Sequence, residues 1–208
     1  MKARGALLGC ACALFAGCVS PAVARHPDLA SRLPASARIA ILPAASSALE
    51  VGYTGLVATL DSEADAAGKA AVEAVQSQLA ARGHSVVALP LEGVRRFEIT
   101  EVQLAAQRAL SRLLRSESKQ ARDEYYGARS VLEPLVSLAR PVNADALLFV
   151  GVSQEARRNG LGLVDYQEEV GVVLLDAWTG EVLYAAAAGR TSHSRDLTAL
   201  ATAALGEL

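Results

Sequence analysis

The chain has 208 residues, of which 52% are hydrophobic and 4% aromatic, and its formal net charge at pH 7 is −2. This balance excludes the strongly basic surface that marks nucleic-acid-binding proteins. The length allows one domain that buries roughly 70% of the surface its unfolded chain exposes.

Residues 1–17 form a leader rather than a part of the fold. Lys2 and Arg4 give it a positively charged start, and residues 6–16 form an apolar run. The run has the length usual in secretory signals, roughly 7–15 residues, and is too short to cross a bilayer, which takes ~20 apolar residues. Small residues at Ala16 and Gly17 suit cleavage directly before Cys18.

Residues 14–18, Leu-Phe-Ala-Gly-Cys, resemble the cleavage motif of bacterial lipoproteins, with Phe15 where leucine is commonest. The resemblance implies removal of residues 1–17, a diacylglycerol thioether on the Cys18 sulfur, and acylation of its new amino group. Several acyl chains, at ~0.8 kcal/mol per buried methylene, anchor a protein stably. Val19 replaces the aspartate that often retains lipoproteins in the inner membrane, which favours the periplasmic face of the outer membrane.

An ordinary secreted protein, cut after Ala22-Val23-Ala24, is the alternative. In the lipoprotein interpretation Cys10 and Cys12 are removed with the leader and Cys18 is acylated. The mature chain then has no thiol for a disulfide, a metal site or a nucleophile.

The remaining chain divides into a tether and a domain. Residues 18–36 carry three prolines and no periodicity, which predicts a flexible tether. Residues 37–208 are expected to form a single periplasmic α/β domain with a helical insertion at 91–140.

The domain begins with a β-α-β unit. Residues 38–43 predict a buried strand closed by proline, and residues 44–60 a long loop. A helix then runs from a cap at Asp61 or Ser62 to Gly83, with Val72, Val75 and Leu79 on its apolar stripe. Residues 84–90 predict a second strand, parallel to the first through a right-handed crossover.

The insertion is expected to be helical. Residues 100–103 fit a capping box that starts a helix as far as Tyr126, with one face formed by Val102, Ala106, Ala109 and Leu113. A second capping box at 130–133 starts a short helix that ends before Pro141.

The last part predicts an antiparallel meander and a closing helix. Residues 144–152 form the clearest strand, Asn159-Gly160 a type I′ hairpin turn, and residues 164–175 and 181–186 the next two strands. Asp196 caps a helix through Leu205. The fold class is therefore α/β, with a single mixed sheet of about five strands.

Four segments carry a family resemblance: residues 38–43, the helix leading to 80–87, residues 144–152, and 173–184 with its Asp-Ala-Trp-Thr-Gly-Glu turn. Together they resemble periplasmic lipoproteins related to the curli-secretion lipoprotein and the amino-terminal domain of TolB. The resemblance implies a non-enzymatic accessory or assembly factor of an envelope machine, working through protein contacts. It leaves a homo-oligomer open, although the insertion is longer than the group leads us to expect.

Five basic residues form the leading candidate contact surface. They are spaced 4, 3, 4 and 3 apart, which puts them on one face of a continuous helix: Arg108, Arg112, Arg115, Lys119 and Arg122. This basic helix face predicts docking of an acidic protein, or of an anionic envelope ligand such as cell-wall glycan or lipid phosphate. The alternative is a solvated face relieved by neighbouring acidic residues.

Tyr53 and Leu56 form a second candidate contact surface. They follow the first strand, and open α/β sheets tend to place ligands beyond the carboxyl ends of their strands. A loop that folds these side chains onto the core is the alternative.

No pattern of catalytic or cofactor-binding residues stands out. The three histidines lack His-x3-His spacing, and Ser192-His193-Ser194 with Asp196 is typical of turns and caps. Gly160-Leu-Gly162 lacks the third glycine and the context of a dinucleotide loop. We expect no enzymatic activity, no metal and no cofactor.

Overall fold

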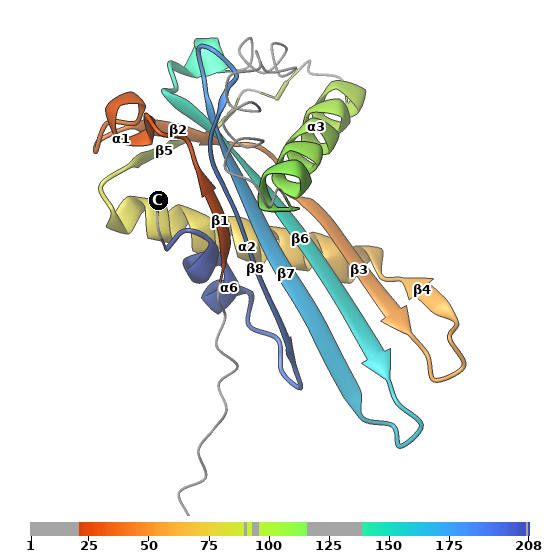
Figure 1. The fold of residues 1–208 in the computed structure, drawn as a ribbon. Helices are drawn as coiled ribbons and strands as arrows, with labels where there is room; N and C mark the ends of the chain where they lie inside the picture. Colours follow the sequence, from red (N-terminus) through yellow and green to blue (C-terminus); the bar gives the residue numbers. More distant parts are fainter. Residues whose placement is uncertain (1–20, 90, 93–95, 116–138, 207) are drawn as a thin grey trace, which may run out of the picture.

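The computed structural model describes residues 21–89, 91–92, 96–115, 139–206 and 208. Its elements form one mixed sheet with helices on both faces (Figure 1). The strands are β1 (Ala22–Arg25), β2 (Arg38–Ile41), β3 (Ala45–Val51), β4 (Val57–Thr59), β5 (Ser85–Val87), β6 (Ala146–Arg158), β7 (Val164–Asp176) and β8 (Val182–Ser192). The helices are α1 (Leu29–Arg32), α2 (Asp61–Ala81), α3 (Arg96–Arg115) and α6 (Leu197–Ala204), with a 3-10 turn at Arg140–Val142.

The sheet confirms the predicted mixed topology but has eight strands instead of about five. Its order is β1-β8-β7-β6-β2-β5, with β3 paired to β6 and β4 paired to β3. The β-α-β start is confirmed, because β2 and β5 are parallel, and so is the antiparallel meander of β6, β7 and β8. The strands missing from the prediction are β1, β3 and β4.

The predicted loop at 44–60 is wrong, since it contains β3 and β4. Strand β3 continues β2 along the same side of β6: Ile41 lies opposite Leu148, and Ala45 opposite Gly151. Residues 42–44 therefore face only residues 149 and 150, which makes a bulge at Pro43, a residue without a backbone donor. Alanine and serine dominate β3, so its sequence lacks the β-branched run that marks a strand.

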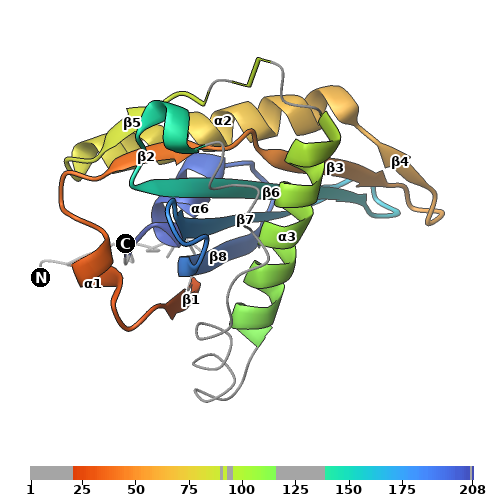
Figure 2. The ribbon, with the colours of Figure 1, turned by 90° about the horizontal axis from the view of Figure 1, so that it is seen from above.

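Each face of the sheet has its own core. Helices α2 and α6 pack on one face, over Ile39, Leu148 and Leu174 among others. Helix α3 crosses the other face (Figure 2) and packs on Leu147, Phe149 and Val173. The predicted apolar face of the insertion helix is confirmed, since all four of its residues are buried: Val102, Ala106, Ala109 and Leu113.

Helix starts were predicted less well. Helix α2 begins at Asp61, but its N-cap is Leu60 and makes no side-chain cap bond. Helix α3 begins at Arg96, so Thr100 is an internal residue and not a cap. The cap of α6 is confirmed, because the Asp196 carboxylate accepts from the Ala199 amide at 3.1 Å. The second capping box at 130–133 and the helix end at Tyr126 lie outside the described residues.

The β6–β7 hairpin is confirmed, but its loop is longer than the predicted two-residue turn. Asn159 Oδ1 accepts hydrogen bonds from the amides of Leu161 and Leu163, both at 3.0 Å. The left-handed position is Gly162, at φ +81°, and not Gly160. The asparagine side chain thus organises a loop over residues 159–163.

Part of the predicted tether belongs to the domain. Strand β1 pairs antiparallel with β8, from Ala22 opposite Ala187 to Arg25 opposite Tyr184. Because β8 is itself antiparallel to β7, β1 runs in the direction of β7, away from the β6–β7 hairpin. The chain therefore enters the sheet from the hairpin end.

Arg32 fastens α1 to the turn between β7 and β8. Its guanidinium pairs with Asp176 at 2.7 Å and with Glu181 at 2.6 Å. Asp176 also accepts hydrogen bonds from the amides of Trp178 and Thr179. Burial alone would raise the pKa of Asp176, but these amide bonds and Arg32 outweigh it and lower the pKa. The Asp-Ala-Trp-Thr-Gly-Glu motif is thus a turn that also holds the segment before β2.

Replacing this carboxylate should give a pH-dependent loss of stability. A depressed folded-state pKa contributes stability above the unfolded-state pKa of ~3.9 and loses it as pH falls through the folded value. We expect Asp176→Asn to cost about 2 kcal/mol near neutral pH, and the difference from wild type to shrink below about pH 4. Urea denaturation at several pH values measures this, with the exposed Asp65→Asn as control. A cost that is the same at pH 3 and pH 7 would contradict it.

Candidate functional site

Two hairpins project from one end of the sheet, and their loops carry exposed apolar side chains. Among the described residues, seven large apolar side chains are exposed, and five of them lie at these hairpins. We call these five the tip patch: Tyr53 (76% exposed), Leu56 (77%), Val57 (62%), Leu161 (88%) and Leu163 (58%). Such clustering is typical of contact surfaces, whereas single exposed apolar residues are ordinary.

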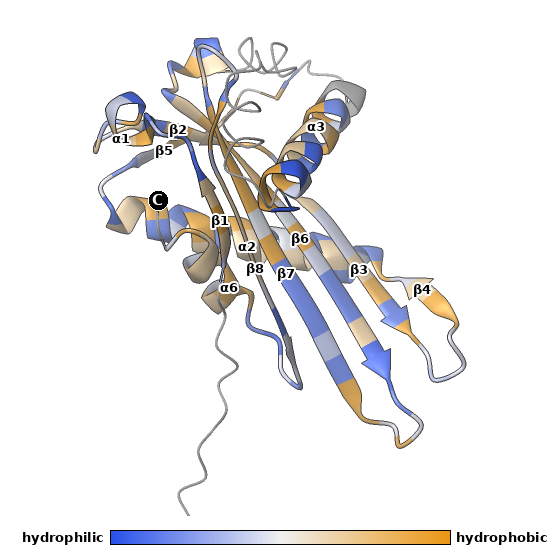
Figure 3. Ribbon diagram, viewed as in Figure 1, coloured by the Kyte–Doolittle hydropathy of each residue, from blue (hydrophilic) through white to orange (hydrophobic). Residues whose placement is uncertain are grey.

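The sheet register brings the two loops together. Strand β3 pairs in parallel with β6 as far as Val51 opposite Arg157. Each strand then enters its loop, so the β3–β4 loop and the β6–β7 loop leave the sheet at the same end (Figures 1 and 3). The tip patch therefore combines, at one end of the sheet, two segments about a hundred residues apart in the chain.

Charged residues separate the tip patch from the core. Arg158 pairs with Glu50 across the two hairpins at 3.1 Å, and Arg157 with Glu155 at 2.5 Å. Figure 3 shows this polar stretch of β6 and β7 between the apolar core and the apolar loops. The tip patch is thus not an extension of the core.

Tyr53 and Leu56 lie in this patch and not over the end of β2, because β3 carries the chain away from β2. Neither side chain packs on the core. The sequence interpretation missed their partners Leu161 and Leu163, although the two leucines flank a glycine in a predicted hairpin turn. That Tyr53 and Leu56 bind a partner stays a prediction.

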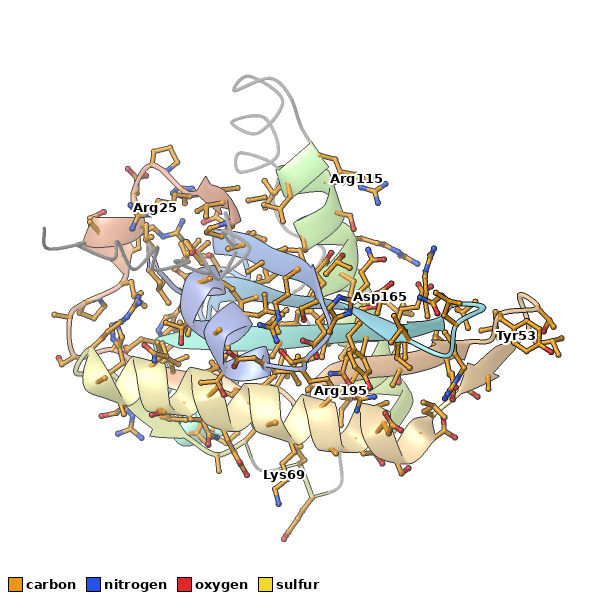
Figure 4. The ribbon with its side chains drawn as sticks, turned by 90° about the horizontal axis from the view of Figure 1, so that it is seen from below. Arg25, Tyr53, Lys69, Arg115, Asp165 and Arg195 are labelled. Carbon is orange, nitrogen blue, oxygen red and sulfur yellow. The ribbon has the colours of Figure 1, made fainter. Side chains whose placement is uncertain are left out.

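The basic helix face is only partly described. Arg108, Arg112 and Arg115 are exposed on α3, and no described residue forms an ion pair with them. We call these three the arginine face. Lys119 and Arg122 lie outside the described residues. Figure 4 shows Arg115 at the end of α3, well separated from Tyr53.

The Ser192-His193-Ser194 segment does not form a catalytic triad. His193 is 81% exposed and lies 2.9 Å from Asp165, while Asp196 caps α6. Ser192 donates to the backbone oxygen of Ser194. These contacts fit the predicted turn and cap roles.

Sequence reasoning missed a buried carboxylate, Glu168. Its side chain is fully buried and accepts from Gln154 Nε2 at 2.7 Å, from Arg190 Nη2 at 3.1 Å and from the Asp196 amide at 3.1 Å. It therefore joins β6, β7, β8 and the start of α6. The period of two that places Val170, Val172 and Leu174 on one face also places Glu168 there, and this signal could have found it.

The histidines show no sign of metal binding. His84 lines a hollow of about 750 Å³ with Arg25, His26 and Arg82. Burial and then the charge of Arg82 lower its pKa. No group of three or more metal-ligating side chains occurs within the described ranges.

The helices described also include none that is long and apolar enough to span a membrane.

Comparison with known proteins finds a distant likeness among solved structures. No protein-family model and no curated protein matches the sequence. The PelC dodecamer from Paraburkholderia phytofirmans matches with a TM-score of 0.47 and 15% identity, over 90% of this chain and 92% of that one.

Two further structures match with lower TM-scores. Lipoprotein GNA1162 from Neisseria meningitidis matches with a TM-score of 0.41 and 14% identity, over 82% of this chain and 96% of that one. The LpoB C-terminal domain from Salmonella enterica matches with a TM-score of 0.29 and 15% identity, over 78% and 86%. At these values neither the function nor the assembly of those proteins carries over to this chain.

Removing the carboxylate of Glu168 should lower the free energy of unfolding of the domain. We expect Glu168→Ala to cost about 3 kcal/mol, because it leaves Arg190 and Gln154 half-buried or buried without their acceptor. Its neighbour Glu169 is exposed, so Glu169→Ala is the matched control and should cost within about 0.5 kcal/mol. Denaturant unfolding followed by circular dichroism measures both. Equal costs for the two variants would contradict a supporting role for Glu168.

Proposed function

We propose that the protein is an outer-membrane-anchored periplasmic lipoprotein that serves as a non-enzymatic accessory or assembly factor of an envelope machine. It acts through protein contacts, and Cys18 carries its lipid anchor. The leader, which ends on Ala16-Gly17 directly before Cys18, supports the anchor and the location. The observation that carries the contact role is the arginine face of α3.

This face costs free energy unless something acidic meets it. Like charges four residues apart on a helix destabilise it by a few tenths of a kcal/mol per pair. The opposite face of α3 already packs on the sheet through Val102, Ala106 and Leu113. Its outer face has no packing role toward the part of the chain that the structure describes, and an acidic partner surface would relieve its repulsion.

A partner protein suits the position of the arginine face better than lipid does. Helix α3 packs over Leu147, Phe149 and Val173, in the half of the sheet away from the hairpins. The chain enters the sheet from the hairpin end, so an anchor at Cys18 puts the membrane on that side. The alternative is an anionic envelope ligand, cell-wall glycan or lipid phosphate, bound through the same face.

Neutralising the arginine face should remove partner binding without unfolding the protein. We expect the triple variant Arg108→Gln, Arg112→Gln, Arg115→Gln to change stability by within about 0.5 kcal/mol per exposed site. It should lose the envelope components that crosslink to the wild-type protein in cells. Lys69→Gln, at an 80% exposed side chain on α2, is the matched control.

Salt and digestion separate the two candidate ligands. Exposed charges are screened beyond ~8 Å at physiological ionic strength, so crosslinking through the arginine face should fall as salt rises. A crosslinked species degraded by protease supports the protein partner, and one degraded by muramidase supports glycan. Binding that survives high salt in the wild type would contradict both.

The anchor is tested by replacing its sulfur. Cys18→Ser should abolish the acyl modification and release the protein from the outer-membrane fraction, because the thioether cannot form. Intact mass of the wild-type mature chain should show loss of residues 1–17 and gain of acyl chains. Unchanged membrane association together with an unmodified wild-type mass would contradict lipidation.

A further inference from the structure

We propose that the tip patch contacts the lipid bilayer that holds Cys18, as a second and shallow membrane attachment. The proposal rests on the proposed anchoring of Cys18 and adds a surface to it. It concerns the loops at 52–56 and 159–163 together with Val57 at the start of β4, which carry the five exposed apolar side chains.

The direction of β1 puts the anchor and the tip patch on the same side of the domain. Strand β1 runs away from the hairpin end, so its first residue, Ala22, is the end of β1 that lies nearer the hairpins. Cys18 precedes Ala22 by four residues. A chain spans at most ~3.6 Å per residue, which keeps Cys18 within about 14 Å of Ala22.

The hairpins reach further than the anchor. Ala22 lies opposite Ala187, which lies opposite Gly171, which in turn lies opposite Gly151. Ala22 and Gly151 are therefore at the same level of the sheet. Val164 is seven residues beyond Gly171 (171 − 164) along β7, which is about 23 Å at the rise of a strand. This distance exceeds the reach of about 14 Å between Ala22 and Cys18. If Cys18 is held at the membrane and the hairpins point toward it, the hairpin loops therefore reach the bilayer.

The side chains in the loops suit a bilayer interface. Leucine and valine gain from leaving water, and tyrosine favours the level of the lipid headgroups, where its ring is buried and its hydroxyl stays hydrated. The ion pairs Glu50–Arg158 and Glu155–Arg157 lie directly behind the loops. Charges at this position limit the contact to the loops and keep it shallow.

A site-specific label distinguishes lipid from protein at the patch. The mature chain has no thiol besides the acylated Cys18, so Leu161→Cys and the control Lys69→Cys each give one labelling site. Leu161 is 88% exposed in a loop, and its replacement leaves the core untouched. The lipidated full-length products, labelled with nitrobenzoxadiazole, are placed in vesicles of phosphatidylethanolamine and phosphatidylglycerol.

We expect the label at position 161 to show a blue-shifted emission and quenching by lipids that carry a nitroxide near the headgroup. The label at position 69 should show neither. Tyr53→Cys, in the other loop, should behave as Leu161→Cys does. Quenching should persist at high salt, because the contact is apolar.

The outcomes separate this inference from the anchor. Intact mass and vesicle flotation report the anchor alone. If the protein floats with its acyl chains but the labels at 161 and 69 are equally exposed, the membrane contact is wrong and the anchor stands. A blue shift at 161 without lipid quenching would mean that protein, a second copy or a partner, covers the patch, and would overturn the proposal.

Discussion

The arrangement of this protein depends on the pairing of β6 along its whole length. This strand has 13 residues and pairs with β7 over all of them. Its other edge is shared by β2 and β3, which follow one another with a single bulge at Pro43. Without the bulge, the side chains of β3 would change faces. The register of β6 therefore decides both what α2 covers and where the β3–β4 hairpin ends.

The two halves of the sheet are stabilised differently. In the half that includes Leu147 to Val150, helices cover both faces and the strand is buried throughout. Toward the hairpins from Gly151 and Gly171, the core under α3 ends, and the strands become mostly polar. Gly171 leaves room for Leu110, since a Cβ there would lie 2.5 Å from the leucine Cδ2. The buried Glu168 lies near the boundary between the apolar half and the polar half of the sheet. Its hydrogen bonds join three strands and the start of α6 there.

The elements predicted correctly are those whose sequence pattern lies within the element itself. The buried run of β6, the apolar stripes of α2 and α3 and the cap of α6 are local patterns, and they were predicted correctly. Strands β1 and β4 are short, and β3 is poor in β-branched residues, so their pairing with β8, β3 and β6 makes them strands. Lys119 and Arg122 lie outside the described residues, so the basic face is described at three of five positions. The tip patch was found in part, because register with a distant strand is needed to join Tyr53 to Leu161.

The contacts proposed for the tip patch and for the arginine face differ in their physics, so one protein could make both at once. An apolar contact is nearly independent of salt, whereas contacts between exposed charges weaken as ionic strength rises. The two surfaces are joined by β6, since its outer end leads to the tip patch and its inner half carries α3. Any tilt of the domain at the membrane would therefore move the arginine face with it. Under the two proposals, a partner that binds α3 would meet a surface whose height and orientation are set by the proposed lipid anchor and the hairpin loops together.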